Sequence, residues 1–295
     1  MNISAAFKNN RVMKSLTGLT ISEFENLSPL FDQSLRKSLL NKPRLRKIGG
    51  GRHGVLPKSS DKLFYILFYL KVYPTYDLAG FVFNVDRSRP CNWVAQFIPI
   101  LEDILQRKCV LPKRKIKTAE EFFELFPDVR DLFVDGTEHK VQRPRSDKNQ
   151  KRRYSGKKKT HTRKNLVASD ENKRIIAISP TKNGKIHDKK LFDKAGWRSW
   201  IPPDVSLWVD TGFIGITKNG GDIFMPKKKS KNHPLTKKEK QENRAIASIR
   251  VVSEHAIGGL KRFNSVAETY RNRKGQDDKF IILAAGLWNT HLQEI

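Results

Sequence analysis

Two aspartates stand where short apolar runs of the sequence end. Asp135 closes the run that begins at Leu132, and Asp210 closes the run that begins at Leu207, with a glycine within two positions of each. Carboxylates at the carboxyl ends of strands in a layered sheet project into the crevice where ligands bind. An aspartate that leaves a strand also often caps a turn, which would be a purely local role. Two aspartates in the same setting favour a shared site.

Glu254 is a third candidate carboxylate, and it falls in a predicted long helix over residues 237–263. At about 100° per residue, Arg250, Glu254 and Lys261 form one stripe of this helix, so Glu254 could lean toward the two aspartates. The pattern also fits a surface ion pair between Arg250 and Glu254, which are four residues apart. The neighbouring apolar stripe is expected to pack on a sheet and consists of Ile249, Val252, Ala256, Leu260 and Phe263.

Three carboxylates suit a particular chemistry. Carboxylate oxygens prefer hard cations such as Mg²⁺ or Mn²⁺, and the three acids lack the Cys/His spacing of a structural zinc site. Two such ions, about 3.5–4 Å apart, can activate a water or a 3′-hydroxyl and stabilise the leaving oxygen. Because the protein then adds mainly positioning and positive charge, Arg250 and Lys261 are expected to clamp phosphate. The three acids therefore fit in-line phosphodiester chemistry.

The net charge points to the same kind of partner. The 295 residues include 58 Lys and Arg against 30 Asp and Glu, a formal charge of +28. A nucleic-acid backbone favours such a surface through counterion release, whereas an enzyme of small metabolites rarely needs it. A basic surface that serves solubility or another anionic partner is the alternative. With 38% hydrophobic residues, the chain is expected to fold.

Two basic segments adjoin the candidate strands. Residues 140–164 contain twelve lysines and arginines and a single acid, Asp147, and a second cluster follows Pro226. A charge run is usually a solvated face, but this placement favours a rim that contacts DNA phosphates. The predicted phosphate-binding residues of the two segments are Lys151, Arg152, Arg153, Lys157, Lys158, Lys159, Lys227, Lys228 and Lys229.

A pair of short helices is predicted in the first half of the chain. Thr75 provides an N-cap for residues 76–83, and Ser88 can cap the next helix after a tight turn. The pair suits a DNA-binding helix-turn-helix, and it also fits an ordinary three-helix packing unit. Asn92 and Gln96 share one face of the second helix, and both can read adenine edges. The candidate base-reading residues are Arg87, Ser88, Arg89, Asn92 and Gln96.

The remaining pattern defines the expected architecture. Short apolar runs bounded by turns predict strands over residues 132–136, 166–168, 175–178, 207–210 and 222–225. Helices are expected over residues 20–40, 61–70, 188–197, 237–263 and 280–292. Strands followed by helices imply an α/β layer domain. The predicted parts are N-terminal helices with a basic arm (1–54), a helix-turn-helix domain (55–110) and an α/β domain (111–295).

Several other classes of protein are disfavoured. The longest apolar run, residues 63–72, is far too short to span a membrane. The N-terminus lacks the apolar stretch of a signal peptide. Cys91 and Cys109 lie outside any metal-ligand spacing and fit a reduced intracellular compartment. These features predict a cytoplasmic protein, associated with the nucleoid, with no membrane partner.

Six segments together resemble bacterial insertion-sequence transposases of the DDE superfamily, from about Leu16 onward. They are residues 67–75 (LFYLKVYPT), 134–138 (VDGTE), 154–161 (YSGKKKTH), 186–189 (IHDK), 209–213 (VDTGF) and 252–263 (VSEHAIGGLKRF). The resemblance implies an all-α helix-turn-helix domain ahead of an α/β catalytic domain with a ribonuclease-H-like mixed sheet and flanking helices. It also implies that Asp135, Asp210 and Glu254 are catalytic metal ligands for two Mg²⁺ or Mn²⁺ ions.

The implied activity is cleavage at the ends of a mobile element, followed by strand transfer into target DNA. The expected partners are double-stranded DNA, both terminal inverted repeats and target, and further copies of the chain in a homodimer or larger assembly. Many relatives carry a Tyr-x2-Arg-x3-Glu-x6-Lys signature, of which Arg250, Glu254 and Lys261 are present, but Ala247 replaces the tyrosine. A catalytically silent DNA-binding regulator and a nuclease without strand transfer are the alternatives.

Overall fold

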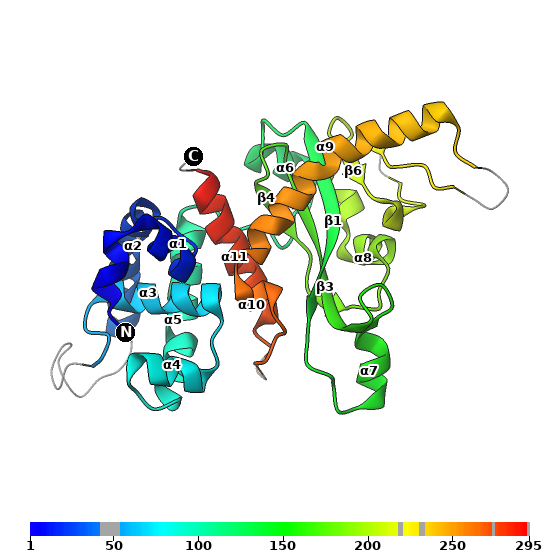
Figure 1. Cartoon of the computed structure of the whole chain (residues 1–295). Helices are drawn as coiled ribbons and strands as arrows, with labels where there is room; N and C mark the ends of the chain where they lie inside the picture. Colours follow the sequence, from blue (N-terminus) through cyan, green and yellow to red (C-terminus); the bar gives the residue numbers. More distant parts are fainter. Residues whose placement is uncertain (42–53, 218–220, 230–233, 273–274, 294–295) are drawn as a thin grey trace. The chain divides into compact units, whose positions relative to one another are not determined.

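The computed structural model describes residues 1–41, 54–217, 221–229, 234–272 and 275–293 (Figure 1). Its contacts define two compact units. The helical unit comprises residues 1–111, 261–268 and 279–295, and the sheet unit comprises residues 112–260 and 269–278. The predicted basic arm at residues 42–53 lies outside the described residues.

The helical unit confirms the predicted helices at residues 20–40, 61–70 and 76–83, whereas the helix after the tight turn, predicted to be short, has 20 residues. Its elements are η1 (Ile3–Lys8), α1 (Asn10–Thr17), α2 (Ile21–Leu40), α3 (Ser59–Val72), α4 (Tyr76–Phe83), α5 (Ser88–Arg107) and α10 (Asn264–Ala267). Thr20 and Glu23 form the capping box at the start of α2, and the hydroxyl of Thr75 accepts from the Leu78 amide at the start of α4. Ser88 is not the cap of α5 as predicted, because the turn before it is closed by Asp86, whose carboxylate accepts from the Ser88 amide.

The last helix, α11 (Asp277–Leu292), belongs to both units. Its first two residues lie in the sheet unit, and the remainder packs with the helical unit, where Phe280 meets the rings of Tyr69 and Tyr73. A helix that is apolar nearly all round must be buried, and residues 280–285 are all buried. The contacts therefore place most of α11 in the helical unit, whereas the predicted α/β domain, residues 111–295, included this helix.

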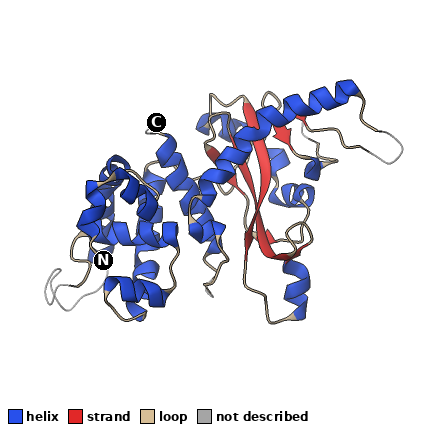
Figure 2. Cartoon of the chain, in the orientation of Figure 1, coloured by secondary structure: helices blue, strands red, loops and turns tan. Residues whose placement is uncertain are grey.

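The sheet unit contains a mixed sheet (Figure 2). Its strands are β1 (Asp131–Lys140), β2 (Tyr154–Ser155), β3 (Thr160–Ser169), β4 (Ile175–Ile178), β5 (Lys182–Asn183), β6 (Ser206–Val209) and β7 (Ile223–Phe224). The main order is β2-β3-β1-β6-β7, with β4 and β5 also paired to β3. Strand β1 runs antiparallel to β3 and parallel to β6. Both β1 and β3 are twice the predicted length or more, because their polar halves pair with each other and need no apolar run.

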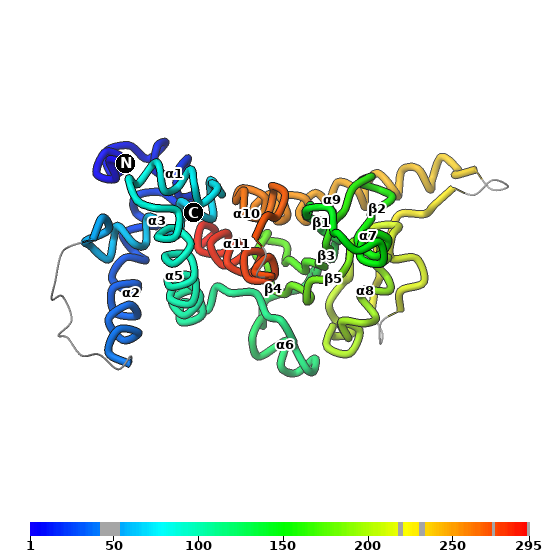
Figure 3. Tube along the Cα trace, turned by 90° about the horizontal axis from the view of Figure 1, so that it is seen from below, coloured from blue at the N-terminus to red at the C-terminus, as the bar shows by residue number. Residues whose placement is uncertain are grey.

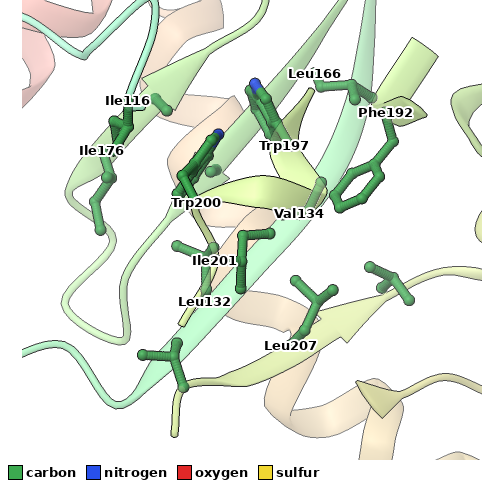
Figure 4. Packing of buried hydrophobic residues seen from close by; sticks show 14 of the residues in the cluster. Ile116, Leu132, Val134, Leu166, Ile176, Phe192, Trp197, Trp200, Ile201 and Leu207 are labelled. Atoms are coloured by element: carbon green, nitrogen blue, oxygen red, sulfur yellow. The ribbon is translucent and has the colours of Figure 1, made fainter. Parts of the chain in front are cut away.

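Helices cover both faces of this sheet. The helical elements of this unit are α6 (Ala119–Leu125), α8 (Asp188–Ala195), α9 (Lys237–Lys261) and two short 3-10 turns, η2 (Trp197–Ser199) and η3 (Thr211–Phe213), together with α7 (Asp147–Arg153), which has no buried residue. Figure 3 shows α9 on one side of β1 and β3, with α6 and α8 on the other. On the α6 and α8 side, Trp197, Trp200 and Ile201 pack with Leu132 and Val134 of β1 in one buried cluster (Figure 4).

Only the second half of α9 is buried. Its buried positions are Ser253, Ala256, Ile257, Gly259 and Leu260, whereas Ile249 is 43% exposed. The predicted packing stripe is therefore wrong at Ile249, because the sheet does not extend under the first half of this helix. Within the described residues, no helix is both long enough and apolar enough to cross a membrane.

Candidate active site

Strands β1 and β6 bring Asp135 and Asp210 together. The two strands are parallel and adjacent, with Val134 paired to Val209. The residue that follows each of these valines in the chain is one of the two aspartates, and neighbouring strands lie about 4.8 Å apart. The predicted convergence of the two carboxylates is therefore present, but only Asp210 follows the end of its strand, because Asp135 is the fifth of the ten residues of β1.

Each aspartate accepts a local backbone hydrogen bond through one oxygen. Asp135 Oδ1 accepts from the Gly136 amide at 2.7 Å, and Asp210 Oδ1 accepts from the Gly212 amide at 2.7 Å. Asp210 thereby caps η3, so the turn-capping role considered for such an aspartate is present. Among the described residues, no hydrogen bond engages the second oxygen of either aspartate, so it can meet another partner.

The electrostatics of the pair are unfavourable without a cation. Burial raises the pKa of Asp135 to about 6, the Asp210 carboxylate adds to the rise, and the Gly136 amide and Arg250 only partly oppose it. Two carboxylates that share a site repel each other, and a cation bound between them would relieve that repulsion. The donor chemistry of Asp135 and Asp210 thus fits a hard divalent ion.

Asp188, at the start of α8, is a third acid at this site and was not among the predicted site residues. It also raises the pKa of Asp135. A Cβ atom on Gly136 would lie 2.5 Å from Asp188 Oδ1, and one on Gly212 would lie 2.9 Å from Asp188 Oδ2. The two glycines that follow the aspartates therefore make room for Asp188. An acid in a first helical turn has an ordinary local explanation, so its spacing gave no signal.

A buried lysine holds Asp188 in place. Lys164 Nζ lies 3.0 Å from Asp188 Oδ1 and 3.2 Å from Glu138 Oε1. Burial opposes ionisation of Glu138, but a hydrogen bond from Thr162 and the Lys164 charge keep the pKa of Glu138 below its usual value. The ion pairs of Lys164 with Glu138 and Asp188 therefore fix the Asp188 carboxylate against Gly136 and Gly212.

The structure does not gather Glu254 with the two aspartates. Glu254 is exposed on α9, whereas Arg250, one turn earlier, is half-buried and acts on Asp135. No ion pair joins Arg250 to Glu254 within the described part of the chain. Lys261 is exposed at the end of α9. Among the described residues, no three His, Cys, Asp or Glu side chains are close enough together to hold a metal ion.

The candidate base-reading residues form one exposed surface at the start of α5. Arg87, Ser88, Arg89, Asn92 and Gln96 are all exposed. Arg87 lies 3.7 Å from Asp77 in an ion pair that is solvent-exposed on both sides and therefore weak. Behind this surface, Val94 and Phe97 are buried against the rest of the helical unit. The geometry is that of a second helix whose outer face can enter a groove.

The predicted phosphate-binding residues lie on three surface segments of the sheet unit. Lys151 and Arg152 are exposed and Arg153 half-buried on α7, while Lys157, Lys158 and Lys159 are exposed in the turn between β2 and β3. Lys227, Lys228 and Lys229 are exposed after β7, and Lys227 pairs with Glu242 at 3.1 Å. Helix α7 and the β2–β3 hairpin were not predicted, because a basic run carries no apolar periodicity.

Comparison with known families assigns both parts of the chain. Residues 134–289 match the family described as DDE superfamily endonuclease, and residues 55–107 match the helix-turn-helix of DDE superfamily endonuclease. This chain belongs to the DDE superfamily of insertion-sequence transposases. A similar relative is the probable transposase for insertion sequence element IS702 of Microchaete diplosiphon. It is 33% identical over 233 residues, which cover 79% of this chain and 80% of the relative.

Membership of this superfamily confirms the predicted fold class, a ribonuclease-H-like mixed sheet with flanking helices, preceded in the chain by an all-α helix-turn-helix domain. It also establishes the general function, that of a DNA-binding transposase enzyme with an endonuclease domain. No solved structure matches the chain at a significant level.

Proposed function

We propose that this transposase binds the terminal inverted repeats of a mobile element, cleaves phosphodiester bonds there and joins the 3′ ends to target DNA. The observation that carries the proposal is the pair Asp135 and Asp210, each directly after the last paired residue of the adjacent parallel strands β1 and β6 of a DDE-superfamily domain. The proposal includes a homodimer or larger assembly, because two element ends must be held together.

The proposed cofactors are two Mg²⁺ or Mn²⁺ ions. Asp135 and Asp210 would hold them, since the two carboxylates repel each other and each has an oxygen free of backbone contacts. Membership of the DDE superfamily supports Glu254 as the third ligand, although its carboxylate is exposed on α9 and is not gathered with the two aspartates in this structure. When bound, such ions activate the attacking oxygen and stabilise the leaving one.

The chain's own residues would position the DNA. Arg250 already neutralises part of the charge at Asp135, which suits a group that also clamps the scissile phosphate. Lys261 lies on the same helix and would contact the phosphate backbone farther along it. The exposed lysines and arginines of α7, of the β2–β3 turn and of residues 227–229 would add contacts that do not depend on sequence.

One experiment separates this proposal from its two alternatives. A supercoiled plasmid that carries the element's ends is incubated with the protein and Mg²⁺, and the products are resolved on a gel. We expect joined strand-transfer products. Nicked or linear products without joining would indicate a nuclease only, and binding without cutting would indicate a silent regulator.

Replacing Asn92 or Gln96 with alanine is expected to weaken binding to the cognate end by about tenfold, because a bidentate base contact contributes about 1–3 kcal/mol of discrimination. Binding to random duplex DNA should barely change. Fluorescence anisotropy with labelled duplexes of both kinds measures the difference. Both side chains are exposed on α5, so the fold should not suffer.

Gln106 is also exposed on α5, ten residues or about 15 Å beyond Gln96, and Gln106→Ala provides a matched control for the helix surface. It should bind the cognate end as the wild type does. Equal losses on cognate and random DNA for Asn92→Ala would remove this residue from the set of base readers.

Replacing Lys157, Lys158 and Lys159 together with alanine is expected to lower affinity for all duplex DNA. Each lysine that neutralises a phosphate contributes about 0.9 to the slope of log K against log salt, so the triple variant should have a slope shallower by about 3. The slope is measured by titration at several salt concentrations. An unchanged slope would show that the β2–β3 turn lies away from the bound DNA.

A further inference from the structure

A hollow on the sheet unit lies beside the β2–β3 hairpin. It has a volume of about 540 Å³ and is lined by Arg143, Gln150, Lys151, Tyr154, His161 and Lys185. This size falls in the range of small-ligand pockets. Six residues from the loop before α7, from α7, from the hairpin and from the loop after β5 thus enclose one space.

Two aromatic rings form one wall of the hollow. Tyr154 of β2 pairs directly with His161 of β3, so both side chains lie on the same face of the hairpin. The rings meet edge to face, with centroids 5.7 Å apart, and Tyr154 is 45% exposed. An edge-to-face pair leaves at least one face of the tyrosine ring open for a further flat group.

Positive charge surrounds these rings. Arg143 Nε donates to Gln150 Oε1 at 2.9 Å, which fixes the guanidinium, and no hydrogen bond among the described residues engages its terminal nitrogens. Lys151 and Lys185 are exposed, and no carboxylate occurs among the described lining residues. Within the described ion pairs, none of these three cations has an acidic partner. The hollow therefore combines an open aromatic face with uncompensated positive charge.

We propose that this hollow binds one unpaired nucleotide of a DNA strand, with its base stacked on Tyr154 and its phosphate held by Arg143, Lys151 and Lys185. Aromatic faces and cations together bind single-stranded DNA, because an unpaired base offers its flat face, whereas a paired base presents only its edge. Gln150 lies beside the base, where its amide can contact a base edge. The inference rests on the proposed action on DNA and names a substrate form within it.

The position of the hollow suits this role. The His161 carbonyl accepts from the Val141 amide, so the hollow lies next to the end of β1. Val141 follows Asp135 by six residues, or about 20 Å at 3.4 Å per residue. A strand that leaves the proposed catalytic site along β1 can reach Tyr154, so an unpaired nucleotide near a cleaved end would be held there.

Binding without divalent ions tests the proposal. Fluorescence anisotropy in EDTA compares a duplex that carries an unpaired 3′ overhang with the same duplex paired to its end. We expect Tyr154→Ala to weaken binding of the overhang duplex about tenfold and to leave the paired duplex unchanged. Tyr154→Phe should keep the wild-type affinity, because the stacking face remains. Lys185→Ala should also weaken binding of the overhang duplex. The control is Lys194→Ala, which removes an exposed lysine of α8 outside the hollow and should weaken this binding less.

A fluorescent base provides a second readout. With 2-aminopurine at the unpaired position, stacking on Tyr154 should quench its emission in the wild type and in Tyr154→Phe but not in Tyr154→Ala. Equal affinity of Tyr154→Ala for the overhang, or emission that is unchanged by wild-type protein, would overturn the proposal. Displacement of the overhang by an equal concentration of free ATP would also overturn it, in favour of a mononucleotide site. Plasmid cleavage by the wild type tests the proposed function separately, because the binding assays contain no divalent ion.

Discussion

Asp135→Asn is expected to abolish cleavage and joining of plasmid DNA, with a rate at least about a thousandfold below that of the wild type. A metal ligand contributes several kcal/mol of transition-state stabilisation, and about 4 kcal/mol corresponds to three orders of magnitude. Asparagine keeps the size of the side chain and an oxygen that can accept from the Gly136 amide, so the change removes little besides the charge. Single-turnover cleavage with saturating protein measures the rate.

The same variant should be as stable as the wild type or more stable when no divalent ion is present. The pKa of Asp135 is raised to about 6 in the folded chain, so the ionised carboxylate disfavours folding. For an acid with a raised pKa, this cost is fully present above about pH 6 and disappears below the unfolded value near 4. After a discount for partial exposure, the ionised carboxylate costs about 1–2 kcal/mol of folding free energy. At pH 7.5 the melting temperature of Asp135→Asn should therefore lie about 2–4 °C above that of the wild type. The gain should vanish at pH 4.

Asp204→Asn is the matched control, because Asp204 is an exposed aspartate in the loop before β6. It should cleave at the wild-type rate and melt at the wild-type temperature. Cleavage by Asp135→Asn at more than a tenth of the wild-type rate would remove Asp135 from the catalytic site. A large fall in its melting temperature would mean that the missing activity reports unfolding.

The two aspartates were predictable from sequence, and Asp188 was not. A residue that directly follows an apolar run is placed by the strand which that run forms, and two parallel neighbouring strands place two such residues side by side. Asp188 reaches the site only because α8 starts beside Gly136 and Gly212, two positions where a side chain would collide with it. That proximity depends on three segments far apart in the chain, so no local pattern reports it.

Helix α9 shows a different limit of sequence reasoning. Its period of 3.6 residues correctly places Ala256 and Leu260 on a buried face, but it also predicts burial of Ile249, which is exposed. Periodicity gives the direction in which a side chain points and not the extent of the surface beneath it. The same limit applies to Glu254, whose predicted approach to Asp135 and Asp210 remains a proposal.

The polar half of the β1–β3 ladder was missed for a third reason. Strand propensity largely reflects packing against neighbouring residues, and polar residues such as Glu138, Lys164 and Arg163 are paired across the two strands or with residues beyond them. These residues carry the buried charge network that continues to the start of α11. The sequence alone indicates the charges but not which of them are paired.

The strongest expected effect on stability comes from that network. Asp277→Ala should lower the free energy of unfolding of the sheet unit by about 3–5 kcal/mol, because it removes one partner of a buried ion pair and leaves the others uncompensated. Asp277 is 3% exposed, and its Oδ1 accepts from Arg163 at 2.8 Å. Its Oδ2 lies 3.1 Å from Nε2 of His139, which is buried on β1. Urea denaturation followed by tryptophan fluorescence measures the loss, since Trp197, Trp200 and Trp208 all lie in this unit.

Asp278→Ala is the matched control at the next position. Asp278 binds Arg114 and accepts from the Thr181 amide at 2.9 Å, but its side chain is 37% exposed against 2% for that of Asp277. Water can replace much of what an exposed carboxylate loses, so the expected cost is about 1 kcal/mol. Equal costs for the two variants would mean that burial does not set the strength of this network.

The pH dependence of the difference between wild type and Asp277→Ala identifies its electrostatic origin. Burial alone would raise the pKa of Asp277, but the bonds to His139 and Arg163 hold that pKa below its usual value. An acid with a lowered pKa stabilises the fold fully above its unfolded value, near 4, and loses that contribution as the pH falls through the folded value. The difference should therefore be constant from pH 7 to pH 5 and shrink below pH 4. A difference that persists undiminished at pH 2 would assign the loss to packing at the start of α11 instead of to the carboxylate charge.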